Sequence, residues 1–455
     1  MFLSRKMKKF ALLLLACLFV SFCSLFKSKV PPYPSGVVFP LKKAAEVVYE
    51  GKVIDRIENI AGKLYFATTK GKVYCLDSLK HQILWRFEVS GPLESPLFFS
   101  EGNIYVYDIQ NTLYCLDSNG NLLWKKKVEG KITSGVGKFR GKTFLGMEKG
   151  IFLALDAASG EEIWRFKVGG AIRTMPVFSG DEIIFGCDDF NLYFLSEKGT
   201  LAGQIKVEGK IQSTPLVEKK SLYFGADDHY FYRYNLAKRK RKWRLKTGGK
   251  ISTPAIIRGK KIYFLSWNNV LYCLNKRNGS ILWWSTIPSR SFYRLEFSGE
   301  KIVVSSLSSL LLCFDVETGK KVGEYDAGQE LKSNPLWQAP YLMYNLYDDQ
   351  TDKGRLVFLE KVIKVSLKSS LESPQIVRKE IIFTVSVVGF HKPGYEFYLR
   401  EGEEERIGQE RSEKKSWAWF PEKEGDFIVR VRVVDEKESR EAEIPFVIKK
   451  NEKNI

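Results

Sequence analysis

Short apolar stretches alternate with turn residues along most of the chain. Residues 97–128 are typical: apolar side chains recur at alternate positions in four stretches, with glycine, asparagine or aspartate between them. A period of two between turn residues predicts β-strands. The four strands expected here cover residues 97–99, 103–107, 112–116 and 122–128.

A tryptophan returns at intervals of 39 or 40 residues, or twice that, and marks a repeat. Its positions are Trp85, Trp124, Trp164, Trp243 and Trp283. An aspartate that opens a turn precedes it in three copies, at Asp77, Asp117 and Asp156, and in the third copy Gly160 follows the aspartate. Where the tryptophan is missing, Gly203 and Gly323 keep the spacing. A fixed period of this length indicates one supersecondary unit copied many times.

The repeat predicts an all-β fold. A four-stranded sheet cannot bury both faces alone, and radial packing of such sheets gives a β-propeller. Seven full units cover residues 56–325, and residues 332–360 form an incomplete eighth unit without its outer strand. An apolar stretch at residues 46–50 lies before the first unit. We expect an eight-bladed propeller over residues 46–360, closed by this N-terminal strand, which removes an exposed sheet edge.

Residues 154–164 match the motif Ala-x-Asp-x-x-x-Gly-x-x-x-Trp at every fixed position. The chain therefore resembles the family with pyrroloquinoline-quinone-type (PQQ-like) propeller repeats. The resemblance implies that each repeated tryptophan docks between neighbouring blades, a place that suits a large ring with one polar group.

Enzymes of that family imply a pair of adjacent cysteines, a calcium ion and an acidic base. The chain has no adjacent cysteines, and its paired acids at 188–189, 227–228 and 348–349 occupy one hairpin turn of their units. Aspartate is favoured in turns for backbone reasons alone. We therefore expect no catalytic, cofactor-binding or metal-binding residue, with a PQQ-dependent dehydrogenase as the alternative.

The N-terminus has the layout of a secretory signal over residues 1–26: a basic start at residues 5–9 and an apolar core from Phe10. Leu14-Leu15-Ala16-Cys17 resembles a bacterial lipobox, which makes Cys17 the expected lipidation site, ahead of Cys23. Cleavage to a soluble protein and an uncleaved anchor at residues 10–26 stay open. Each reading places the propeller outside the cytoplasm. Residues 27–45, with three prolines, read as a linker.

The remaining cysteines are expected to be buried and unpaired. Cys75, Cys115, Cys273 and Cys313 share one repeat position, and Cys187 has another. Corresponding residues of stacked sheets lie about 10 Å apart, beyond the roughly 7 Å that a disulfide can bridge. The three histidines are far apart in sequence and show no zinc spacing.

The formal net charge of +19 favours an anionic partner. Two basic runs, at residues 125–127 and 238–242, read as solvated blade rims that block edge pairing, or as contacts to lipid phosphates or acidic polymers. Export would separate the chain from nucleic acid, so we expect no nucleic-acid partner.

The period stops after residue 360. Strands expected at residues 363–367, 380–390, 395–400, 416–420, 426–434 and 443–448 predict a small immunoglobulin-like or fibronectin-like β-sandwich over residues 361–450.

The layout is similar to that of BamB-like outer-membrane assembly lipoproteins, although the added sandwich departs from it. The resemblance implies a non-enzymatic, lipid-anchored scaffold in the periplasm or at the outer membrane. We expect a monomer that binds envelope proteins, including those of an outer-membrane assembly complex. A cell-wall or carbohydrate-binding module is a further alternative, through aromatics such as Trp267, Trp284 or Trp337.

Overall fold

A computed structural model describes residues 41–291, 293–338, 340–390, 393–435 and 439–450. All regular elements in this part of the chain are strands, which confirms the predicted all-β class. The described residues contain no helix that is long and apolar enough to cross a membrane. The predicted signal at residues 1–26, with Cys17 and Cys23, lies outside them.

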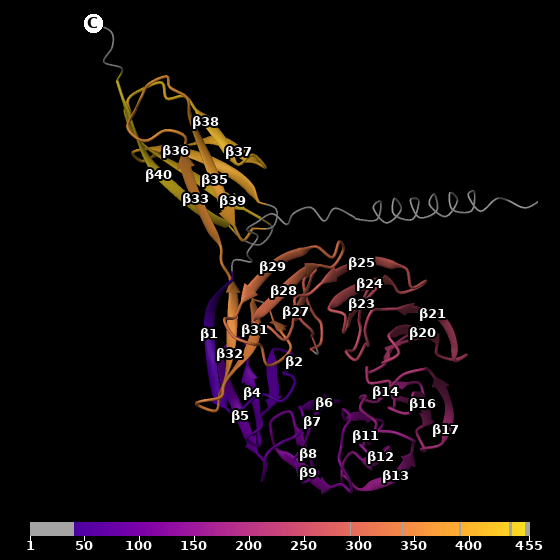
Figure 1. Ribbon diagram of the computed structural model, residues 1–455. Coiled ribbons are helices and arrows are strands. Elements are labelled where there is room, and N and C mark those ends of the chain that lie inside the picture. Colours follow the sequence, from indigo (N-terminus) through magenta and orange to yellow (C-terminus); the bar gives the residue numbers. More distant parts are fainter. Residues whose placement is uncertain (1–40, 292, 339, 391–392, 436–438, 451–455) are drawn as a thin grey trace, which may run out of the picture. The chain divides into compact units, whose positions relative to one another are not determined.

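Eight four-stranded antiparallel sheets follow one another in chain order around a common centre (Figure 1). The first four are β2 (Glu58–Ile60), β3 (Lys63–Ala67), β4 (Lys72–Asp77) and β5 (Gln82–Glu88); β6 (Phe98–Ser100), β7 (Asn103–Tyr107), β8 (Thr112–Asp117) and β9 (Leu122–Lys127); β10 (Gly137–Phe139), β11 (Lys142–Gly146), β12 (Ile151–Asp156) and β13 (Glu162–Lys167); β14 (Val177–Ser179), β15 (Glu182–Gly186), β16 (Asn191–Ser196) and β17 (Leu201–Lys206).

The fifth to seventh sheets repeat this order, and the eighth combines the two ends of the repeat region. They are β18 (Leu216–Glu218), β19 (Ser221–Gly225), β20 (Tyr230–Asn235) and β21 (Lys240–Lys246); β22 (Ile256–Arg258), β23 (Lys261–Ser266), β24 (Val270–Asn275) and β25 (Ile281–Thr286); β26 (Glu296–Ser298), β27 (Lys301–Ser305), β28 (Leu310–Asp315) and β29 (Lys321–Asp326); and β30 (Leu336–Gln338), β31 (Tyr341–Asp348), β32 (Lys353–Lys361) and β1 (Leu41–Glu50).

Burial along the strands follows their place in the sheet. The two middle strands are buried on both faces, as in β12, where Phe152 to Leu155 are all buried. Outer strands alternate between exposed and partly buried residues, as in β13. Middle strands lie between two neighbouring sheets, so their sequences are nearly continuous apolar runs, whereas an outer strand needs apolar residues on fewer positions.

Eight apolar clusters each join two consecutive sheets. Leu64 and Leu76 of the first sheet pack with Met343 and Phe358 of the eighth, so the last sheet also contacts the first. The other seven clusters join the pairs between them in order. The hydrophobic core is therefore a set of sheet-to-sheet interfaces, each buried by its neighbours.

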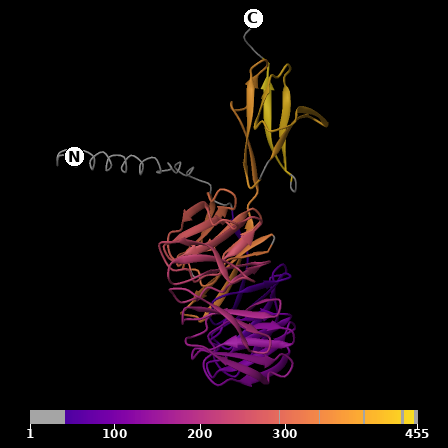
Figure 2. The ribbon, with the colours of Figure 1, turned by 90° about the vertical axis from the view of Figure 1, so that its right-hand side faces the viewer.

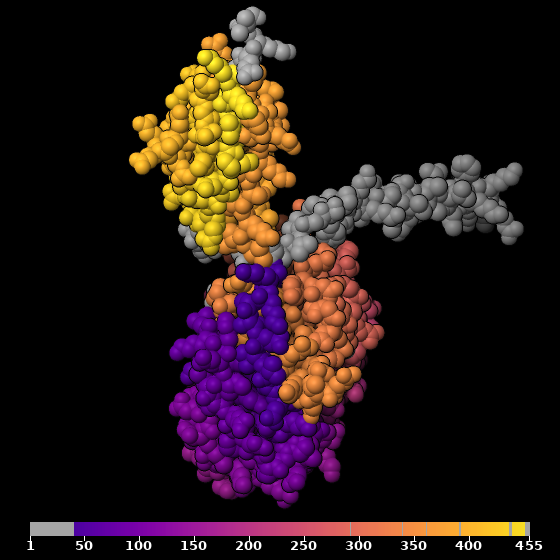
Figure 3. All heavy atoms as spheres, turned by 90° about the vertical axis from the view of Figure 1, so that its left-hand side faces the viewer, coloured from indigo at the N-terminus to yellow at the C-terminus, as the bar shows by residue number. Residues whose placement is uncertain are grey.

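β1 supplies the outer strand of the eighth sheet, in antiparallel register from Leu41↔Lys361 to Glu50↔Lys353. Figure 3 shows β1 in indigo beside orange residues of the later chain. The strand starts five residues earlier than the expected residue 46, so residues 41–45, assigned above to the linker, belong to the sheet. Backbone pairing of an edge strand tolerates polar side chains, which explains why this start was missed.

The antiparallel order places the connections alternately on two faces of the propeller. One face, called here the turn face, carries the turns from first to second and from third to fourth strand. The ends Leu41 and Lys361 also lie there, paired with each other. The loop face carries the hairpins between second and third strands and the segments that join consecutive sheets.

Residues after Lys361 form two further sheets with one shared core. The three-stranded sheet contains β33 (Lys364–Ser369), β35 (Ile381–Val388) and β38 (Ser416–Trp419). The five-stranded sheet contains β34 (Gln375–Ile376), β40 (Ser439–Lys449), β39 (Gly425–Val434), β36 (Gly394–Glu401) and β37 (Glu404–Ser412). Phe383 and Trp419 of the first sheet pack with Phe397, Val431 and Phe446 of the second, and β39 and β40 run side by side in yellow (Figure 2).

Candidate interaction surfaces

Each repeated tryptophan reaches the next sheet on the turn face. The indole Nε1 donates a hydrogen bond to a backbone carbonyl 33 residues further on, which lies in the turn between third and fourth strands of the next sheet. The N···O distance is 2.9 Å from Trp124 to Ala157 and 3.2 Å from Trp164 to Glu197. Trp124 and Trp283 are buried, and the other three are partly buried.

The turn that receives the indole has a glycine at a fixed place. A Cβ on Gly160 would lie 2.6 Å from the Trp124 ring, and a Cβ on Gly199 would lie 2.6 Å from the Trp164 ring. Both glycines have positive φ, a backbone region that favours glycine. Four of the indoles also stand beside a cysteine or alanine on the neighbouring strand, such as Cys115 opposite Trp124, whereas Trp243 stands beside Arg233. Gly120, Gly279 and Gly319 receive Trp85, Trp243 and Trp283 in the same way.

Two interfaces reverse this size pattern, and sequence reasoning missed the residues that do so. The fourth sheet has Gly203 at the tryptophan position and Phe194 opposite it. The next turn then carries Arg239 in place of glycine, with its guanidinium 4.4 Å from the centre of the Phe194 ring. Arg239 also pairs with Glu182. It is therefore an interface residue and an exception to the expected solvated rim at residues 238–242.

The interface of the eighth and first sheets shows the same reversal. Ala45 has the tryptophan position and Phe358 lies opposite it. His81 takes the glycine place with φ of 55°, and its ring centre lies 4.5 Å from that of Phe358. The signal was present in the sequence: the turn lacks glycine only where the preceding sheet lacks tryptophan.

The repeat aspartates hold the turns that receive the indoles. Asp156 Oδ1 accepts backbone N–H groups from Ala158 and Ser159 at 3.0 and 2.9 Å. These hydrogen bonds, that of Ser159 first, hold the pKa of Asp156 below its ordinary value. Asp77 and Asp117 accept backbone N–H groups in the same way. The three carboxylates therefore act on turn geometry.

On the loop face, the hairpins of consecutive sheets lie beside the segments that join the sheets, and both carry polar side chains. In consecutive sheets, a hairpin N–H donates to a carbonyl of the segment that joins two sheets, at 2.9 Å from Asp188 to Ala171 and from Asp227 to Lys210. We call the polar side chains of these hairpins and joining segments the polar row. Its members are Lys131, Glu148, Arg173, Asp188, Lys210, Asp227, Lys250, Trp267 and Arg290.

Charges in the polar row pair across sheets. Arg173 Nε lies 3.0 Å from Asp188 Oδ2, and Lys210 of the following sheet lies 3.9 Å from the same atom. Lys250 Nζ lies 3.6 Å from the centre of the Trp267 ring, and the Arg290 guanidinium lies 5.4 Å from it. The row therefore contains two groups of charged contacts, one around Asp188 and one around Trp267.

Asp227 is the least satisfied member of the polar row. Its Oδ1 is buried and has no hydrogen-bond partner among the described residues. Burial raises the pKa of this carboxyl. Its sequence neighbour Asp228 differs, because it accepts the Tyr232 hydroxyl at 2.6 Å and the Tyr230 N–H at 3.0 Å. Asp189 accepts Tyr193 and Asn191 in the same manner.

The other candidate groups take structural places in the described part of the chain. No cluster of three or more His, Cys, Asp and Glu side chains there has metal-site geometry. Cys75, Cys115, Cys187, Cys273 and Cys313 are free and buried, and burial raises the pKa of Cys115 to about 11. Trp337 packs against an interface cluster, whereas Trp284 is 58% exposed on β25.

The family described as outer membrane protein assembly factor BamB matches residues 60–133, 110–202, 148–258 and 247–360. Together these matches cover residues 60–360, well over half of the chain. The chain belongs to this family. β1 and the sandwich lie outside the matched residues.

Individual BamB proteins and propeller structures agree on the fold. An outer membrane protein assembly factor BamB from Nitrosomonas eutropha is 26% identical over 125 residues, which are 28% of this chain and 31% of that protein. The chain thus matches about a third of the length of this curated relative. The crystal structure of BamB from Moraxella catarrhalis superposes with a TM-score of 0.60 at 14% identity, over 70% of this chain and 97% of that one.

A propeller enzyme has a comparable fold. The quinohemoprotein alcohol dehydrogenase from Comamonas testosteroni gives a TM-score of 0.59 at 11% identity, over 71% of this chain and 76% of that one. Sequence identity this low shows a shared fold alone.

Proposed function

We propose that this chain is an exported, non-enzymatic scaffold of the BamB family that binds envelope proteins of an outer-membrane assembly complex. In this proposal the eight four-stranded sheets are the blades of one ring, closed by β1, and the sandwich is an immunoglobulin-like module. The chain acts as a monomer at the periplasmic side of the outer membrane, anchored by lipid on Cys17. The polar row on the loop face is the contact surface.

Asp227 is the main reason for choosing the loop face as the contact surface. A buried carboxylate oxygen without a partner costs free energy, about 1–3 kcal/mol for a polar group and more for a charged one. A cationic or N–H group from a partner protein would recover that cost on binding. Exposed Arg173, Lys210 and Arg290 lie in the same row and can pair with acidic groups of the partner. This combination supports binding to a mixed-charge protein surface.

The polar row and the two ends of the propeller strands lie on different faces. Leu41 and Lys361 lie beside each other on the turn face, whereas the polar row is on the loop face.

Charge reversal on the loop face tests the proposal. Tagged full-length chain with Arg173→Glu should recover clearly less partner from detergent-solubilised envelope than the unmodified chain. Arg140→Glu is the matched control, because Arg140 is similarly exposed and ion-paired, with Asp181 and Glu197, but belongs to the turn face. Equal recovery by both variants, or no partner at all, would contradict the proposal. A rise in melting temperature with pyrroloquinoline quinone and calcium, together with alcohol oxidation, would favour a dehydrogenase instead.

A further inference from the structure

In each sheet, the residue two positions after the tryptophan, or after Gly203, Gly323 or Ala45 where these take its place, faces the interface with the next sheet. Six of the eight interfaces have an apolar residue there that packs in the shared cluster: Phe87, Phe166, Ile205, Leu245, Tyr325 and, in β1, Val47. Lys126 and Ser285 are the two departures. The repeat therefore normally seals this end of each interface with its own apolar side chain.

The interface of the second and third sheets also lacks the aromatic ring that this side chain usually meets. Phe87 lies 6.4 Å from Tyr114 and Phe166 lies 6.3 Å from Tyr193, centre to centre. The third sheet has Leu153 at the position of these tyrosines. Lys126 and Leu153 together thus remove two rings from one interface.

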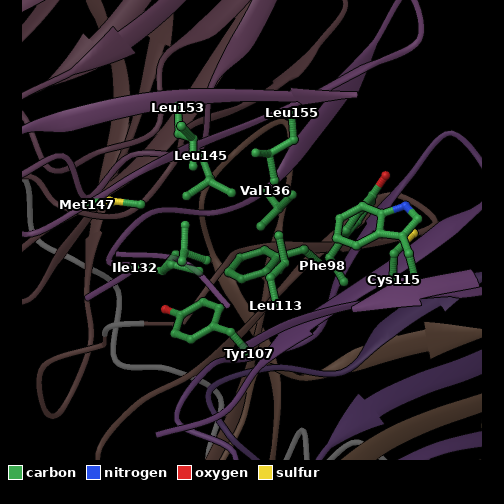
Figure 4. Packing of buried hydrophobic residues seen from close by; sticks show 13 residues of the cluster. Phe98, Tyr107, Leu113, Cys115, Ile132, Val136, Leu145, Met147, Leu153 and Leu155 are labelled. Atoms are coloured by element: carbon green, nitrogen blue, oxygen red, sulfur yellow. The ribbon is translucent and has the colours of Figure 1, made fainter. Parts of the chain in front are cut away.

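A slot of about 150 Å³ lies at this interface. Its apolar lining is Val128, Met147, Ile151, Leu153 and Leu155. Figure 4 shows Leu153, Leu155 and Met147 within the packed cluster of the two sheets. A cavity of roughly this volume accepts benzene in another protein, so the slot matches one aromatic or large aliphatic side chain.

The other departure makes a polar contact with the next sheet. Ser285 donates its hydroxyl hydrogen bond to the carbonyl of Gly319 in the next sheet. A polar contact thus replaces the apolar one at that interface. Lys126 instead directs its ammonium group to Glu161 in a neighbouring turn, 2.6 Å away, and the slot stays beneath it.

The rim of the slot carries unpaired positive charge. Arg165 pairs with Glu162 at 2.6 Å and with Glu129 at 3.6 Å. Lys127 is part of the lining, as are Glu129 and Glu162. Lys127 and Lys125, which lies two residues before it on β9, are exposed and have no ion-pair partner within the described residues. β9 is also the edge strand of its sheet. An extended segment can lie along such an edge, with specificity set by a pocket for one side chain.

We propose that the slot binds one aromatic or large aliphatic side chain of an extended, acidic segment of a partner protein. The side chain takes the place that Phe87 or Phe166 has in the neighbouring interfaces, and acidic residues beside it pair with Lys125 and Lys127. This inference rests on the proposed scaffold function and adds a second contact, between the second and third sheets. Its lining residues Glu129 and Met147 lie close in sequence to the part of the polar row that holds Lys131 and Glu148.

Short peptides test the slot directly. The probe is a labelled peptide with one phenylalanine between aspartates, measured by fluorescence anisotropy with the full chain; its companions replace phenylalanine by alanine or the aspartates by lysines. We expect the phenylalanine–aspartate peptide to bind roughly tenfold or more tightly than the alanine peptide. Lys126→Phe, which fills the slot from within, should abolish this difference, whereas Ser285→Phe at the equivalent interface should preserve it.

Several outcomes would overturn the inference. They are equal binding of the phenylalanine and alanine peptides, unchanged binding to Lys126→Phe with an undiminished melting temperature, and binding that appears only after residues 1–40 are removed, which would make the chain's own N-terminal segment the occupant. Partner recovery tests the scaffold function separately. If the unmodified chain does not distinguish the peptides but Arg173→Glu still lowers partner recovery, only the slot is refuted. If the chain distinguishes the peptides but Arg173→Glu does not lower partner recovery, only the polar row is refuted.

Discussion

At the residue scale, the sheet interfaces are held by matched sizes rather than by one invariant contact. Four of the five indoles have cysteine or alanine beside them, Trp243 has Arg233, and all five meet a glycine in the facing turn. In the fourth and eighth sheets, which lack the indole, phenylalanine stands beside the vacant position and Arg239 or His81 enters from the turn. The same space is filled from either side, as dense packing of a protein interior requires.

Substitutions at two turn glycines can separate the contribution of the indole to the free energy of unfolding from that of the backbone conformation. Gly199 and Gly180 both have positive φ, but only Gly199 faces a tryptophan, whereas a Cβ on Gly180 would meet open space. We expect Gly180→Ala to lower the free energy of unfolding by about 1–2 kcal/mol. Gly199→Ala should cost about 1–3 kcal/mol more because the methyl group overpacks against Trp164. Urea unfolding measures both, and equal losses would mean that the indole contact is loose.

The reversed interface of the fourth and fifth sheets can be converted to the common pattern. A Cβ on Gly203 would lie 3.0 Å from the Arg239 guanidinium. Gly203→Trp alone should therefore clash, and Arg239→Gly alone should leave a void. We expect the double variant to be more stable than the sum of the single changes, by about 0.5–3 kcal/mol of coupling free energy. Additive losses in a double-mutant cycle by urea unfolding would contradict size matching.

Glu296 predicts a dependence of stability on pH. Burial raises the pKa of this carboxyl to about 7, against a partly opposing effect of Arg294. Between pH 4.5 and 7 the folded chain then binds more protons at this site than the unfolded chain, so stability falls as pH rises through this window. The shift corresponds to at most about 3 kcal/mol. Glu296→Gln should flatten this part of the profile and raise stability at pH 8, as thermal unfolding across pH would show; a parallel profile would exclude Glu296 as the source.

At the element scale, the outer strands share a bulge that keeps them apart from other sheets. The register shifts at the same place in all seven full units, as between Cys115 and Leu116, and again in β1 between Lys43 and Ala45. The extra residue is an exposed Leu84, Leu123 or Leu282 in three sheets. A bulge twists the strand locally and hinders pairing with another chain at that point, so these apolar residues can remain exposed; in β9 the bulge lies at Leu123, before the residues that line the slot.

β1 should be a main source of stability for the eighth sheet. Val47 and Tyr49 are buried between the eighth and first sheets, and Tyr49 donates a hydrogen bond to Asn345. A chain that starts at residue 41 should melt like the full chain, while one that starts at residue 51 should lose about 1.5–3 kcal/mol for each of the two buried side chains. Thermal unfolding compares the two truncated chains; equal melting temperatures would show that β1 does not stabilise the eighth sheet.

Sequence reasoning recovered the elements that bury apolar side chains and missed those held by backbone pairing. The middle strands follow from short apolar runs between turn residues, and the tryptophan strands follow from their alternation and their fixed spacing. The start of β1 at Leu41 and the edge strand β37 do not, because both are polar: β37 reads Glu-Glu-Arg-Ile-Gly-Gln-Glu-Arg-Ser and is exposed over most of its length. The slot also lay beyond prediction from one sequence, because it depends on Lys126 and Leu153 meeting across two units.

At the scale of the whole molecule, the polar row lies on the face of the propeller opposite to the face that carries Leu41 and Lys361. The antiparallel order within each sheet fixes this separation, because β32 must run from the loop face to the turn face before the chain continues to β33. The slot lies between the second and third sheets, and its lining residues Val128, Glu129 and Met147 belong to the loop face. One partner segment on this face can therefore reach both proposed contacts.

The sandwich has its own core, which predicts that it folds without the propeller. Its buried residues, Phe397, Val431 and Phe446 among them, all come from strands after Lys361. Residues 362–450 alone should unfold cooperatively, with a midpoint in urea equal to that of the second transition of the full chain. Trp164→Ala should lower only the propeller transition, since the two cores share no residue. Fluorescence of Trp417 and Trp419 follows the isolated sandwich, and a single shared transition that shifts with Trp164→Ala would show instead that the two parts unfold as one unit.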